Sequence, residues 1–78
     1  MRIIDNIPHP SLTISIFQMN DKYLVKFEAG AMMEQTFKFY TDDVNSLGKL
    51  KELINEAFIE KVRLRFNDMY LQLKETLS

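Results

Sequence analysis

The sequence predicts an α+β fold in which three or four antiparallel strands precede a long C-terminal helical segment. Three runs between residues 12 and 40 alternate apolar and polar side chains, as strands with one buried face do. From residue 44 onward the apolar side chains recur every three or four residues instead, which is typical of a helix. No proline follows Pro10, so no proline interrupts that segment.

Residues 12–19 and 22–28 predict a hairpin that turns at Asn20-Asp21. A two-residue turn sets Met19 opposite Lys22. The same register aligns the apolar side chains of the two runs, with Ile16 opposite Val25 and Ile14 opposite Phe27. Apolar residues therefore face apolar residues across the hairpin, as a buried sheet face requires.

The run from residue 32 to residue 40 predicts a further strand, reached through a three-residue turn at Ala29, Gly30 and Ala31. This turn would set Phe27 opposite Met33, Tyr23 opposite Phe37 and Lys26 opposite Glu34. Met1 to Asp5 is expected to add a short fourth strand, because its isoleucines need burial. The corner at Pro8-His9-Pro10 would separate this strand from the others.

Thr41 or Asp42 is expected to cap a helical segment that covers residues 42–77. Unbroken, a helix of that length would measure about 54 Å, whereas the strands would span only about 25 Å. Either the chain bends near residues 58–61 or the distal half of the helix reaches a second chain. The predicted core joins sheet and helix residues: Ile14, Ile16, Tyr23, Val25, Phe27, Met33, Phe37 and Phe39 with Leu47, Leu50, Ile54 and Phe58.

The length and composition are those of one globular domain, residues 1–78, with its sheet in residues 1–40. The absence of cysteine excludes disulfides and thiolate metal sites, so association with a second copy is the natural aid to such a short chain. A net charge of −1 argues against strong sequence-independent binding to nucleic acid or anionic lipid. With neither a signal-like N-terminus nor a long apolar run, the cytoplasm is the expected compartment, with no membrane partner.

Material for catalysis is sparse, so we do not expect an enzyme or a cofactor. His9 is the one histidine and lies between two prolines, which indicates a loop residue rather than a ligand or a base. Glu52, Glu56 and Glu60 are spaced to share a helix face, but a di-metal site would need Glu-x-x-His pairs as well. A solvated acidic stripe is the simpler interpretation.

The distal helix is the first candidate site, and we expect it to mediate self-association. Its apolar side chains occupy more than one side of the helix, which normally means burial by more than one neighbour. A homodimer is the simplest arrangement, and a different protein partner is the alternative. The residues expected to take part are Val62, Leu64, Phe66, Met69, Leu71, Leu73 and Leu77.

The outer face of the sheet is the second candidate, because aromatic side chains among lysines suit the stacking of single-stranded bases and contact with phosphates. A sheet-to-sheet interface, or scattered exposed apolar residues, would give the same pattern. The residues of this possible nucleic-acid face are Phe17, Lys22, Leu24, Lys26, Lys38 and Tyr40.

Two resemblances accompany these patterns. Residues 21–30, Asp-Lys-Tyr-Leu-Val-Lys-Phe-Glu-Ala-Gly, followed by Glu-Gln-Thr-Phe-Lys at 34–38, resemble a family of small bacterial proteins of the Bacteroidetes. That resemblance implies no activity and no catalytic residue. The order of strands and then a helix is similar to that of the Whirly and purine-rich-element-binding proteins. Their fold binds single-stranded DNA and pairs through helices and sheet edges, so it too implies self-association.

Overall fold

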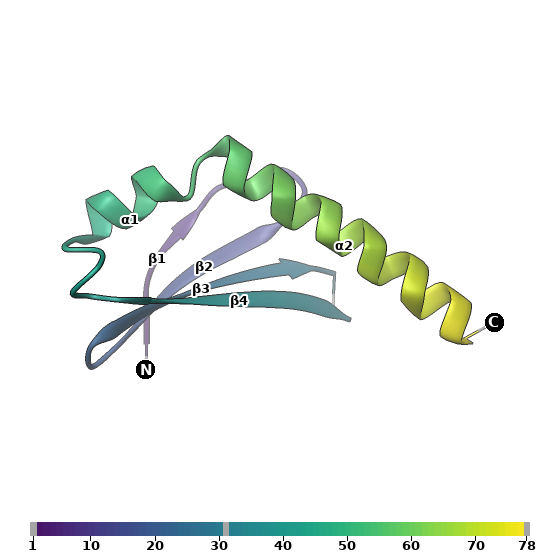
Figure 1. Ribbon diagram of the computed structural model, residues 1–78, viewed down its shortest axis with the longest axis horizontal. Helices are drawn as coiled ribbons and strands as arrows, with labels where there is room; N and C mark the ends of the chain where they lie inside the picture. The colour runs from purple at the N-terminus through teal and green to yellow at the C-terminus, as the bar shows by residue number, and fades with distance from the viewer. Residues whose placement is uncertain (1, 31, 78) are drawn as a thin grey trace.

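Four antiparallel strands form a meander sheet in which each strand pairs with its neighbour in sequence, in the order β1-β2-β3-β4. The computed structural model describes residues 2–30 and 32–77. Its strands are β1 (Arg2–Ile7), β2 (Thr13–Met19), β3 (Lys22–Ala29) and β4 (Met33–Tyr40). The helices α1 (Leu47–Leu53) and α2 (Glu56–Leu77) both cover the same face of the sheet (Figure 1). The predicted α+β fold is therefore confirmed.

The fourth strand expected near the N-terminus is present as β1, and it extends two residues further than the prediction, to Ile7. It pairs with β2, and a bulge interrupts the pairing between Ile3 and Asp5. Met1, which the prediction included, lies outside the described residues. The Pro8-His9-Pro10 segment follows β1 directly and separates it from β2, as expected.

The register of the first hairpin is confirmed, with Met19 opposite Lys22, Ile16 opposite Val25 and Ile14 opposite Phe27. The predicted register of the second hairpin is wrong by two residues. Phe27 lies opposite Gln35, Tyr23 lies opposite Phe39, and Lys26 lies opposite Thr36. The cause is the turn, because Ala29 already pairs with Met33 and Gly30, with a φ of +71°, begins the connection instead of lying at its centre.

The helical segment is broken, and it begins later than predicted. Neither Thr41 nor Asp42 caps a helix, because the first helix starts only at Leu47. The backbone N–H and the hydroxyl of Thr41 both donate to Asp21 O in the turn between β2 and β3. Ser46 is the N-cap of α1, and its Oγ accepts a hydrogen bond from the Lys49 N–H. The chain bends at Ile54 and Asn55 rather than near residues 58–61, because Asn55 Oδ1 accepts the Phe58 N–H at 3.0 Å and starts α2 there.

The core lies between the sheet and the two helices and contains every residue predicted for it. Phe27, Ile14, Ile16, Val25, Leu50 and Val62 are the largest of its fully buried side chains. Met33, Phe37, Phe39, Leu47 and Phe58 belong to it as partly buried members. The structure adds Leu12, Val44, Ile59, Val62 and Phe66 to the buried set. Three of these five lie on α2, so the first half of α2 packs on its own sheet.

Candidate functional site

The first half of α2 is docked on β4. The side-chain amide of Gln35 donates a 3.0 Å hydrogen bond to the backbone oxygen of Val62. Phe58 packs edge-on against Phe37, with their ring centroids 5.0 Å apart. These contacts fix which side of α2 faces the sheet, and hence which side is left outward.

The seven residues predicted for self-association fall into three groups in the structure. Val62 and Phe66 are buried in the chain's own core, which takes them out of the surface that a second chain could contact. The bend at Asn55 causes this, because it turns α2 back over the sheet. Met69 and Leu73 are half-buried. The exposed members are Leu64, Leu71 and Leu77, at 50%, 47% and 74% exposure.

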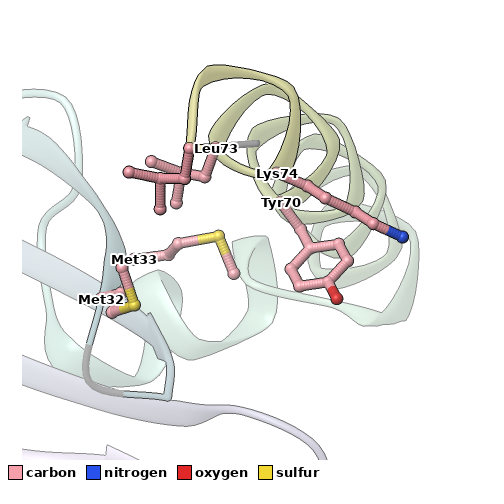
Figure 2. Close-up of a pocket in the computed structure, with 6 residues that line it drawn as sticks. Met32, Met33, Tyr70, Leu73 and Lys74 are labelled. Atoms are coloured by element: carbon pink, nitrogen blue, oxygen red, sulfur yellow. The ribbon is translucent and has the colours of Figure 1, made fainter.

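The C-terminal end of α2 forms an apolar groove with the hairpin that joins β3 to β4. Figure 2 shows Met33 reaching from the hairpin toward the helix, with Leu73 and Tyr70 beside it and the Lys74 amine directed away. The groove has a volume of about 400 Å³. Its lining residues are Met32, Met33, Tyr70, Leu73, Lys74 and Leu77, of which Met32, Tyr70 and Lys74 were not predicted from the sequence. Met32 and Tyr70 come together only because α2 passes over the hairpin.

Charged side chains border the outward leucines of α2. Glu60 and Arg63 form an ion pair one turn apart, and the Arg63 Nε lies 3.0 Å from Glu60 Oε2. The hydrogen bond from Arg63 lowers the pKa of Glu60, and the same contact raises the pKa of Arg63. Lys61 and Lys74 are exposed on the same helix. The outward side of α2 is therefore apolar along its centre and charged along its edges.

The outer sheet face brings together the residues predicted for nucleic-acid contact, although not as an open stacking platform. Phe17 pairs with Leu24 as expected, but Leu24 is only 7% exposed and Phe17 is half-buried. The Lys22 amine lies 5.6 Å from the centroid of the Tyr40 ring. A hollow of about 190 Å³ lies on this face, lined by Phe17, Leu24, Lys26, Glu34 and Thr36.

Lys26 on that face is held by two carboxylates. Its amine lies 3.3 Å from Glu34 and 4.0 Å from Glu28. Glu28 and Glu34 are opposite one another on β3 and β4, and Lys26 offsets their repulsion. The predicted attraction between Lys26 and Glu34 therefore exists, but along the diagonal of the ladder, and it competes with any phosphate for Lys26.

His9 has a structural role in the loop after β1. Its Nδ1 accepts the backbone N–H groups of Ser11, at 3.1 Å, and Leu12, at 3.2 Å. This holds the ring as the tautomer that carries its proton on Nε2. A cleft of about 710 Å³ lies beside it, between the proline loop and the start of α2. Within residues 2–30 and 32–77, no group of three or more His, Asp or Glu side chains is placed to hold a metal ion.

The predicted acidic stripe is not continuous. Glu52 lies on α1 and Glu56 on α2, and the break at Ile54 and Asn55 separates them, so the three glutamates do not share one helix face. Glu60 forms an ion pair with Arg63 instead of extending a purely acidic face.

Comparison with protein-family models, with curated proteins and with solved structures finds no match for this chain. The resemblances drawn from the sequence therefore stay predictions. Neither helix of the described residues is long and apolar enough to cross a membrane.

Proposed function

We propose that this protein is a non-catalytic interaction module that associates with a second copy of itself through the outward side of α2. One observation carries the proposal. Phe66 is the last buried residue of α2, yet the helix continues for about three more turns. That extension has apolar side chains on two sides. Leu71 lies on the outward side, in line with Leu64, and Leu73 and Leu77 line the groove at the hairpin.

An apolar extension of this kind is costly to leave in water. Soluble monomers rarely expose large contiguous apolar surfaces, and those that do use them for binding. A chain of 78 residues also buries a smaller fraction of its surface than a larger domain does, so it gains more from association. A two-fold dimer buries the same surface on both copies and closes the assembly.

Light scattering over a concentration series tests the proposal. The wild-type chain is expected to be a dimer, and Leu64→Glu/Leu71→Glu is expected to be a folded monomer. Leu53→Glu is the matched control, because it places the same charge on an exposed leucine of α1 and should leave the dimer intact. A wild-type chain that stays monomeric at the highest concentration contradicts the proposal.

Single-stranded nucleic-acid binding by the outer sheet face is the second candidate function. The observation in its favour is that both helices lie on the opposite face, which leaves this one open (Figure 1). Fluorescence anisotropy with labelled single-stranded DNA and RNA tests it. Binding that weakens with salt and is lost in Lys22→Glu/Lys38→Glu, but not in Lys49→Glu on α1, supports this function. Equal binding by the two variants contradicts it.

A further inference from the structure

The outward side of α2 has a stripe of its own, distinct from the stripe that packs on the sheet. Leu64 and Leu71 are seven residues apart, which is within about 20° of two full turns, so they lie one above the other. Val62 and Phe66, which are buried on the sheet, lie on the opposite side of the helix. The chain's own core therefore buries one stripe of α2 and leaves Leu64 and Leu71, on the other stripe, about half exposed to solvent.

The charges that flank this second stripe change sign along the helix. On one flank, Glu60 stands near its start and Lys74 near its end. On the other flank, the order is reversed, with Lys61 near the start and Glu75 near the end. Opposite ends of the stripe are thus electrically complementary on both flanks, so two identical helices that pack antiparallel would place unlike charges opposite each other on each flank.

We propose that two copies pack their α2 helices antiparallel across a two-fold axis near Asn67, with Leu64 of each copy against the partner's Leu71. This inference rests on the proposed function and specifies its interface. In that register Glu60 and the partner's Lys74 differ in height along the helix axis by one residue, which is about 1.5 Å. Lys61 is related in the same way to the partner's Glu75. Four attractive pairs surround four leucines.

A parallel, in-register pair would bring opposite flanks together, because its two-fold axis runs along the helices. Lys61 would then lie beside the partner's Glu60, and Glu75 beside the partner's Lys74, whereas the antiparallel pair joins Glu60 to the partner's Lys74 and Lys61 to the partner's Glu75. The two directions therefore predict different charge pairs, and the antiparallel one also opposes the two helix macrodipoles. The side of α2 that faces its own sheet points away from the partner, so the layers of the dimer would run sheet, helix, helix, sheet (Figure 1).

A charge-exchange experiment tests the register. Glu60→Lys alone and Lys74→Glu alone each create two like-charge contacts in a homodimer, so each should dimerise at least about tenfold more weakly than wild type. An equimolar mixture should restore the wild-type affinity as a heterodimer, because every flanking pair is then attractive. Arg63→Gln is the control, since it removes the ion pair within the chain that Glu60→Lys also loses, and it should dimerise like wild type.

Cysteine pairing tests the direction independently, because the chain has no cysteine of its own. Under mild oxidation, a mixture of Leu64→Cys and Leu71→Cys chains should form a disulfide-linked heterodimer, and either variant alone should form little. Leu64→Cys that links efficiently to itself overturns the antiparallel register while leaving self-association intact. The antiparallel register is also overturned if the charge-exchange variants dimerise like wild type while Leu73→Glu/Leu77→Glu dissociates, because the groove is then the interface. A monomeric wild-type chain instead overturns the proposed function together with this inference.

Discussion

At the residue scale, three phenylalanine rings join β3 and β4 to α2. Phe27 stacks on Phe58 with centroids 5.8 Å apart and meets Phe37 edge-on at 5.7 Å. Phe27 is fully buried, so its removal would leave a cavity that the neighbouring rings cannot fill. We expect Phe27→Ala to lower the free energy of unfolding by about 3 to 5 kcal/mol, and Lys26→Ala, on the opposite face, to cost less than about 1 kcal/mol. Chemical denaturation that gives both variants the same midpoint would show that the sheet faces are misassigned.

Asn55 sets the start of α2, and hence the direction in which the helix leaves the bend. Its side-chain oxygen accepts the Phe58 N–H, one of the N–H groups that a helix start leaves unpaired. Asn55→Ala should therefore lower the free energy of unfolding by about 1 kcal/mol. Asn55→Asp, which retains the acceptor, should be nearly neutral in the same denaturation experiment. A larger loss with Asp than with Ala would refute the capping role.

At the element scale, the sequence predicts which face of a strand or helix is buried better than it predicts where that element begins and ends. The slip of two residues in the second hairpin leaves every side chain on the correct face, because the strand period is two, so alternation alone cannot detect it. The helix break is hidden for a related reason. Ile54 and Ile59 are both buried, so the apolar spacing continues through the bend. An asparagine between two such residues is the signal that locates the break.

The same limit applies to the candidate site. The leucines of the outward stripe could be predicted from their spacing, whereas the burial of Val62 and Phe66 could not, because it depends on where the chain bends. The contribution of Met32 to the groove depends on the path of α2 over the hairpin and has no local signature in the sequence. Sequence patterns therefore identify the apolar sides of this helix, and the bend determines which of them remains available.

An ion pair between Asp5 and Lys51 joins β1 to α1. The hydrogen bond from Lys51, followed by one from the Asn6 N–H, lowers the pKa of Asp5. A carboxyl whose pKa is lower in the folded state adds stability above its unfolded pKa, and that stability is lost as the pH falls through the folded value. Asp5→Asn should thus melt below wild type near neutral pH, and the difference should vanish in acid. Asp42→Asn, an exposed carboxyl in the loop before α1, is the control, and a difference for Asp5→Asn that persists in strong acid would contradict the assignment.

At the scale of the whole molecule, the longest dimension is 44 Å because α2 extends beyond the edge of its sheet. The 22 residues of α2 measure about 33 Å, more than the strands of six to eight residues beneath them. The molecule therefore has two unequal parts, a two-layer body that contains the buried core and an extension with little buried in it. Folding and association should be separable along this division.

A chain that ends after Tyr70 tests this separation. The deletion removes only one half-buried apolar side chain, Leu73, and leaves Phe66 in place, so the truncated chain should unfold cooperatively with a melting temperature lower by about 5 °C. It should also be monomeric, because Leu71 and Lys74 are absent from it. Full-length Phe66→Ala is the contrasting variant, since it removes a buried ring and should cost about 3 to 5 kcal/mol of stability. If the truncated chain loses its cooperative transition in calorimetry, the extension is part of the core. If it folds and still dimerises in light scattering, association depends on another surface.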